Sequence, residues 1–210
     1  ILIETLLLCR KAWSWLRLPA WFKSVAGGAA IALIAFVFSD RYLGLGLDTI
    51  QSALEGKDVP WYGFLLKSLT TGLTLNFGGS GGIGTPIFFV GSTAGSALSR
   101  IINMDPAMLS AIGFVSLLAG AANTPIAASI MSVELFGPEV APYAAISCII
   151  SYLITGHRSA YPSQVLAAKK SSSVNVEIGS EMGMSTPDYL YREKSLIETM
   201  RRVWQRLRKK

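Results

Sequence analysis

The chain has 210 residues, of which 51% are hydrophobic and 15% are charged. Soluble domains carry about 25% charged residues, so this composition excludes an ordinary soluble domain and predicts a membrane protein. The net charge of +6 is uneven, because residues 192–210 hold eight basic and two acidic side chains. A basic flank after the last apolar segment is typical of a cytoplasmic tail. We therefore expect this basic segment to contact a lipid bilayer and not a nucleic acid.

Apolar segments and their interruptions predict a series of helices. In chain order these span residues 1–18, 24–39, 61–75, 86–99, 106–119, 126–136, 139–154 and 160–168, with a loop and a short helix in residues 40–60. Thr85 is the expected N-cap of the fourth of these helices, with Pro86 in its first turn, and Asp105 caps the fifth. Trp13, Trp15 and Trp21 predict a membrane boundary. The chain starts inside an apolar segment without Met, so we expect it to be part of a longer protein.

A glycine-rich break interrupts the longest apolar run. Residues 68–99 are thirty-two residues without a charge, yet the stretch FGGSGGIGTPIFF places five glycines and one proline in their middle. About 20 apolar residues suffice for a membrane helix, and irregular backbone survives in a membrane only inside protein or beside a polar cavity. A second break, GAANTP, follows at residues 120–125. Such paired half-helices predict a transport site, in which helix N-termini face an anion. Lys67 and Arg100 bracket the first break, and we expect both to reach the membrane interfaces.

The sequence carries no set of residues for catalysis or for a metal. His157 is the one histidine, and the two cysteines, Cys9 and Cys148, lie in separate apolar stretches where reduced, buried thiols are expected. The glycines of GGSGGIG are followed by Thr-Pro and not by the Gly-Lys-Ser/Thr of a phosphate loop. We therefore expect a protein that binds and moves ions, with neither enzymatic activity nor a cofactor.

Three stretches resemble the second half of the CLC family of chloride channels and chloride/proton antiporters. They are GGSGGIGTPIFFVGSTAGSAL, AGAANTPIAASIMSVEL and TGHRSAYPSQVL, in this order. The first is similar to the family motif G-I-F-x-P, with Gly82, Ile83, Gly84, Thr85 and Pro86 in its five positions. TGHRSAY resembles the approach to the pore tyrosine of the family. The resemblance covers residues 1–168.

The resemblance implies an anion site. In the family, chloride is held by backbone amides at the positions of Ile83 and Gly84 and by a tyrosine hydroxyl, here that of Tyr161. Gly81, Gly82, Thr85 and Pro86 would form the supporting loop. A further serine ligand and the gating glutamate belong to the first repeat of the family, so we expect the pore to need an N-terminal half. Gly84 replaces the usual Phe, which removes a bulky ring from the pore and leaves the amide in place.

The resemblance also implies the architecture and its partners. We expect an all-α polytopic membrane protein with tilted, broken and re-entrant helices, the second half of a CLC-type inverted-repeat fold. Residues 1–168 would be the transmembrane domain, and residues 169–210 a basic cytoplasmic tail with an amphipathic helix. The protein would be a homodimer in the cell membrane, or in the inner membrane of a bacterium, and would transport chloride or a similar small anion as a channel or a chloride/proton antiporter.

Two other interpretations remain open from the sequence. One is a membrane assembly subunit that keeps the fold and does not conduct. The other is an unrelated inverted-repeat transporter of small organic anions. The choice between channel and antiporter, and between chloride, nitrate and fluoride, depends largely on residues outside these 210.

Overall fold

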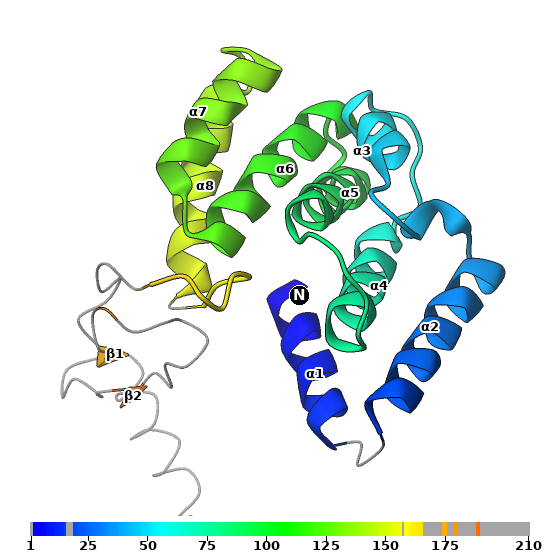
Figure 1. Cartoon of the computed structure of the whole chain (residues 1–210). Coiled ribbons are helices and arrows are strands. Elements are labelled where there is room, and N and C mark those ends of the chain that lie inside the picture. The colour runs from blue at the N-terminus through cyan, green and yellow to red at the C-terminus, as the bar shows by residue number, and fades with distance from the viewer. Residues whose placement is uncertain are drawn as a thin grey trace, which may run out of the picture. The chain divides into compact units, whose positions relative to one another are not determined.

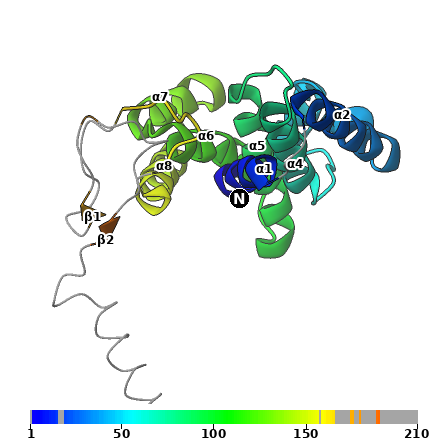
Figure 2. The same ribbon diagram turned by 60° about the horizontal axis from the view of Figure 1, so that its bottom comes forward.

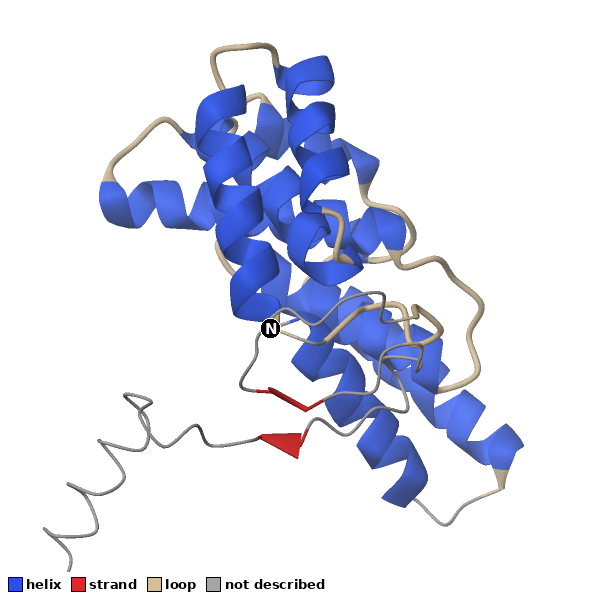
Figure 3. Ribbon diagram, turned by 90° about the vertical axis from the view of Figure 1, so that its left-hand side faces the viewer, coloured by secondary structure: helices blue, strands red, loops and turns tan. Residues whose placement is uncertain are grey.

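The computed structural model describes residues 2–15, 19–156 and 158–165, together with residues 174, 175, 179, 188 and 189. Over these residues the fold is almost entirely helical (Figure 3). The helices are α1 Leu2–Trp15, α2 Ala20–Val37, η1 Asp40–Tyr42, α3 Leu47–Leu54, α4 Gly63–Asn76, α5 Gly84–Ile102, α6 Pro106–Ala122, α7 Pro125–Phe136 and α8 Ala141–Thr155. Two short strands, β1 Val174–Asn175 and β2 Asp188–Tyr189, pair antiparallel. The predicted all-α class is confirmed.

The chain divides into two compact units, residues 1–160 and residues 161–210. The sequence placed this boundary eight residues later, after a final helix over residues 160–168. That helix is wrong over residues 160–165, which form turns. Pro162 disfavours a helical backbone at Tyr161, and the amide of Ala160 donates to the Ala121 carbonyl at 2.8 Å. The basic segment of residues 192–210 and its expected amphipathic helix lie outside the described residues.

Helices α5 and α6 form the centre of the first unit (Figure 1). Helix α4 packs on α5 and also on α1 and α2, while α7 and α8 pack on each other and on α6. A second view shows α1 beside α4, with α2 on the side of the unit away from α7 (Figure 2). The glycine-rich segment between α4 and α5 therefore joins two helices that pack on each other, and its residues 78–82 are exposed in this chain.

Close backbone contact holds α5 against α6. A Cβ atom on Gly91 would lie 2.5 Å from the carbonyl oxygen of Gly113, and a Cβ on Gly95 would overlap the carbonyl oxygen of Leu109. Small residues allow helices to approach this closely, which is a common way of packing helices in membranes, where no hydrophobic effect drives the helices together. Gly91 and Gly95 in α5 and Gly113 in α6 thus set the distance between the two central helices.

Helix boundaries follow the sequence signals in most places. Asp105 accepts a hydrogen bond from the Met108 amide at 2.9 Å, so the predicted cap is confirmed. Asn103 and Asn123 end α5 and α6 in the left-handed conformation, at φ 55° and 58°. The second break is consequently shorter than expected, because Gly120, which the sequence placed in the break, remains in helix α6. Cys9 and Cys148 are both buried and unbridged, as predicted.

Helix α2 is long and apolar enough to cross a membrane. Its 18 residues have a mean hydropathy of 1.7, and most of their surface is not covered by the rest of the chain. Phe36 is 91% exposed, and Leu33 and Val25 are also largely exposed. An apolar face of this extent is typical of contact with lipid or with another protein segment. Helices α6, α7 and α8 are apolar and shorter.

The close contact between α5 and α6 predicts that a larger side chain at Gly95 lowers the thermal stability. Gly95→Ala places a methyl group against backbone that has no room to move, and overpacking of this kind costs about 1–3 kcal/mol. Gly28→Ala, in helix α2, is the matched control, because its new methyl group meets nothing within 4 Å. We expect a lower thermal midpoint in detergent for Gly95→Ala and an equal or higher one for Gly28→Ala. Equal midpoints for the two variants would contradict the close-contact interpretation.

Candidate functional site

The segment between α4 and α5, residues 77–83, is here called the glycine break. Helix α4 ends at Asn76, whose side-chain amide donates to the carbonyls of Gly72 and of Leu6 in α1. The amide of Gly79 donates to the Thr74 carbonyl at 2.9 Å, and Gly78 has φ +92°. A Cβ on Gly79 would lie 2.8 Å from the Thr74 carbonyl oxygen. The chain therefore folds back on the end of α4 in a way that only glycine permits at these two positions.

Helix α5 begins earlier than the sequence indicated. Its first helical residue is Gly84 and its N-cap is Ile83, so the prediction of Thr85 as the N-cap is wrong. The Ile83 side chain packs in an apolar cluster with Ile87, and the Ile83 carbonyl accepts the Ile87 amide at 3.1 Å. This packing places the N-cap two residues before the threonine. Pro86 lies in the first turn, as predicted.

The first turn of α5 presents unpaired backbone amides. The first amides of any α-helix lack an intrahelical acceptor, and no side chain caps α5. Pro86 has no N–H, so the donors are the amides of Ile83, Gly84 and Thr85. A Cβ on Gly84 would meet nothing within 4 Å, so no neighbouring atoms crowd this residue. This arrangement, together with the positive end of the helix dipole, suits an anion.

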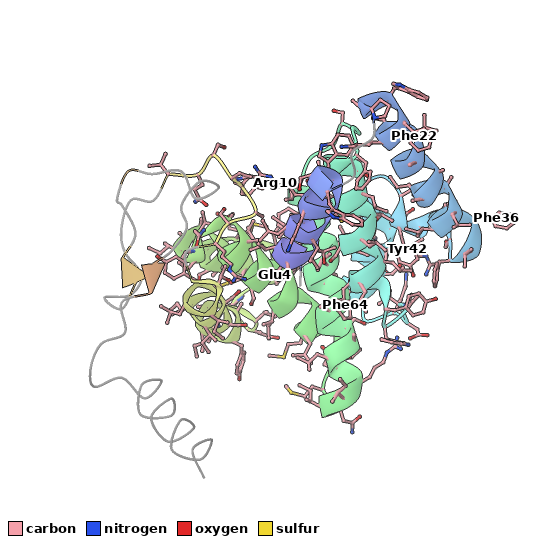
Figure 4. The ribbon with its side chains drawn as sticks, turned by 90° about the horizontal axis from the view of Figure 1, so that it is seen from below. Glu4, Arg10, Phe22, Phe36, Tyr42 and Phe64 are labelled. Carbon is pink, nitrogen blue, oxygen red and sulfur yellow. The ribbon has the colours of Figure 1, made fainter. Side chains whose placement is uncertain are left out.

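The residues that precede Tyr161 are tied to the first unit. Ala160 is buried in the same apolar cluster as Ile83 and Ile87. Arg158 forms an ion pair with Glu4, which is labelled on α1 in Figure 4, and its carbonyl accepts the Asn123 side chain at 3.1 Å. The Arg158 charge is therefore paired. His157 lies outside the described residues.

Tyr161 itself opens the second unit, which is described separately. Its side chain is 37% exposed, and its carbonyl accepts the Gln164 amide at 3.1 Å. The structure thus brings Ile83, Gly84 and the supporting residues Gly81, Gly82, Thr85 and Pro86 together in one loop and helix start. The role of Tyr161 beside them stays a prediction.

The Lys67 side chain is buried inside the unit and does not extend outward, so the prediction that it reaches for an interface is wrong. Its side chain is 2% exposed, and its ammonium donates to the carbonyls of Gly44 at 2.6 Å and Tyr42 at 3.2 Å. These carbonyls come from the end of η1 and from the loop after it, more than twenty residues earlier in the chain. Arg100 behaves differently, because it is partly exposed in the last turn of α5 and forms an ion pair with Asp58.

Helix α4 has a polar face that was not predicted from the sequence. Lys67, Thr70, Thr71 and Thr74 follow one another at helical spacing and all line a cavity of about 450 Å³ that ends at the glycine break. The spacing of one lysine and three threonines within an apolar helix is a signal that could have identified this face, since a charge inside a membrane segment indicates a cavity or a pathway.

The two Thr-Pro pairs, which looked equivalent in sequence, occupy different helix positions. At the second break Thr124 is the N-cap and Pro125 the first residue of α7. At the first break Thr85 and Pro86 are already inside the helix. The first break therefore differs from the second, because its exposed amides belong to Ile83, Gly84 and Thr85 and are flanked by glycine.

Broken helices that expose backbone donors beside a polar cavity define a class of membrane transport proteins. Comparison with known proteins gives the family. The profile described as "Voltage gated chloride channel" matches residues 1–156, and the chain therefore belongs to this family of CLC proteins. Homologues in this family are integral membrane proteins, which supports a membrane location for this chain.

Two curated relatives and one solved structure are similar to the chain. A "Chloride/fluoride channel protein" of Pseudomonas syringae pv. tomato is 42% identical over 152 residues, which are 69% of this chain and 33% of the relative. The "Voltage-gated ClC-type chloride channel ClcB" of Escherichia coli is 25% identical over 166 residues, 74% of this chain and 40% of that protein. The crystal structure of a CLC-type fluoride/proton antiporter superposes with a TM-score of 0.71 at 27% identity, covering 77% of this chain and 41% of the other. The chain thus spans about a third to two fifths of the length of these proteins.

The packing around Gly79 and Gly84 predicts that the two residues differ in their tolerance of a side chain. Gly79→Ala should lower the thermal midpoint, because the new methyl group meets the Thr74 carbonyl, whereas Gly84→Ala should leave the midpoint nearly unchanged. Thermal unfolding of both variants in the same detergent measures this. A loss of stability at Gly84 equal to that at Gly79 would show that both glycines serve packing.

Proposed function

We propose that this chain is the second-repeat part of a CLC-type transporter that moves a small halide across a membrane. The observation that carries the proposal is the start of α5, where the amides of Ile83 and Gly84 have no acceptor and no atom lies within 4 Å of the Cβ position of Gly84. Gly81, Gly82, Thr85 and Pro86 shape the loop that presents these amides. The transported ion is the ligand of this site.

Neutral donors suit transport because the ion must also leave. The helix dipole adds about half a positive charge at the N-terminus, which attracts an anion less strongly than a full cation in direct contact does. Conduction requires a site that binds well enough to admit the ion and weakly enough to release it. Glycine at position 84 lets the ion approach the backbone closely.

Tyr161 would complete the ligand set with one hydroxyl donor. One observation from the sequence supports this role. The sequence TGHRSAY resembles the approach to the pore tyrosine of the family.

Chloride and fluoride are the two candidate ions. The family profile and the Escherichia coli relative carry chloride in their names. The relative at 42% identity is named for chloride and fluoride, and the similar solved structure is a fluoride/proton antiporter, which favours fluoride as the second candidate. Efflux of each ion from liposomes that contain the full-length protein, measured with ion-selective electrodes, separates the two. Efflux of neither ion would support a non-conducting assembly subunit or a transporter of organic anions.

The activity of the whole protein rests on more than these residues. We propose that an N-terminal half supplies the rest of the pore, that two subunits form a homodimer, and that the basic segment of residues 192–210 is cytoplasmic. The excess of basic residues in this segment supports the last point, since cytoplasmic flanks of membrane segments are enriched in Lys and Arg.

Removing one hydroxyl tests the ligand set. Tyr161→Phe deletes a single hydrogen bond to the anion, which is worth about 0.5–1.5 kcal/mol, or up to roughly tenfold in affinity. Calorimetric titration of halide into the purified full-length protein measures the change. An affinity equal to that of the unchanged protein would remove Tyr161 from the site.

Gly84→Phe tests whether this position lines the pathway. The family usually has Phe here, and a side chain at Gly84 starts in open space, so the variant should fold with a normal thermal midpoint. We expect slower halide flux in reconstituted liposomes, because the ring narrows the route while the backbone amide remains. Flux equal to that of the unchanged protein, from equal amounts of folded variant, would place Gly84 outside the constriction.

A further inference from the structure

A cavity between α2 and α4 contains the one lysine that is buried among the described residues. The cavity has a volume of about 450 Å³ and is lined by residues of α2, the loop after η1, α4 and the glycine break. Its polar lining includes Lys67, Thr71 and Ser80 and the backbone of Gly81 and Gly82. A water molecule needs about 10–15 Å³ of such space, so the cavity has room for a small anion with several waters.

Lys67 brings a full positive charge to this cavity. The described ion pairs join Lys57 to Glu55, Arg100 to Asp58 and Arg158 to Glu4, and none involves Lys67. Its hydrogen-bond partners are two backbone carbonyls, and the ring of Phe89 lies 5.1 Å from the ammonium. Carbonyl oxygens and a ring face are neutral. A buried charge is costly unless an opposite charge accompanies it, so the cavity favours an anionic occupant.

Neutral donors line the same cavity. Thr71 is 6% exposed, and its hydroxyl makes no hydrogen bond within the described residues. The Ser80 hydroxyl and the amides of Gly81 and Gly82 are likewise without an acceptor in the described part of the chain. The neighbouring Thr70 and Thr74 differ, because their hydroxyls already donate to backbone carbonyls. Thr71 is therefore the α4 threonine whose hydroxyl is available to a ligand.

We propose that this cavity is a second binding site for a small inorganic anion, held by the Lys67 ammonium and the Thr71 hydroxyl at the side of the glycine break. It differs from the site at the start of α5 in carrying a full charge, and its ligands are side chains of α4. Hydrogen bonds from charged donors are roughly twice as strong as neutral ones, so this site should bind the more tightly of the two. The proposal concerns equilibrium binding and holds whether or not the protein conducts.

Bromide is a suitable probe, because it replaces chloride and is located by anomalous scattering. Crystals of the full-length protein grown in bromide should show an anomalous peak in contact with the Lys67 ammonium, separate from any peak at Gly84. Lys67→Met, which keeps the length of the side chain, should abolish this peak. A carboxylate from another part of the protein in contact with Lys67, or no peak there, would overturn the proposal. A peak at Gly84 alone would overturn it and leave the proposed function intact.

Two threonine variants decide the matter if Lys67→Met fails to fold. Thr71→Val removes the available hydroxyl and keeps the shape of the side chain, and should weaken bromide binding at this site by about tenfold, the loss expected for one hydrogen bond to a charged group. Thr74→Val is the matched control, one turn away on the same face, whose hydroxyl is already used within the helix. Calorimetric titration of bromide into both full-length variants measures this. Equal bromide affinities in the two variants would exclude Thr71 as a ligand and overturn the proposal.

Discussion

The unpaired amides at the start of α5 are the feature to which the rest of the unit is adapted. They exist because Ile83 packs in the apolar cluster and starts the helix before Thr85 can cap it. In a membrane protein such donors persist only where protein or a polar cavity surrounds them. The tight contact of α5 with α6, at Gly91 and Gly95, holds the helix in place, so that its first turn is presented as a rigid set of donors.

The polar face of α4 adds side-chain donors to the backbone donors at the start of α5. Lys67 is buried by the carbonyls of Tyr42 and Gly44, and it lines a cavity that ends at Gly81 and Gly82. A partial charge from the helix dipole of α5 and a full charge from Lys67 are therefore both associated with the loop between α4 and α5. Gly82 and Gly84 leave open space beside this loop, whereas Gly78 and Gly79 allow it to pack tightly on Ser24 and Thr74.

Helix positions could be read from the sequence because apolar runs, Asp105 and the Gly-Pro interruptions act locally. The details of the site depended on contacts between distant residues. Thr85 is a good capping residue, yet the packing of Ile83 fixed the helix start. Lys67 looked like an interfacial charge because its partners, Tyr42 and Gly44, are more than twenty residues away. The helix expected after Ala160 did not form, because Pro162 and the bond from Ala160 to Ala121 favour a turn.

The central claim is that a backbone N–H at the start of α5 holds the anion. Replacing the Gly84 amide with an ester removes this one donor and leaves every side chain unchanged. The same replacement at Ile126 is the control, because that amide also lies in the first turn of a helix, α7, at the other break. Halide titration of the full-length protein should show affinity lower by up to roughly tenfold for the ester at Gly84 and unchanged affinity for the ester at Ile126. Unchanged affinity with the ester at Gly84 would contradict the account.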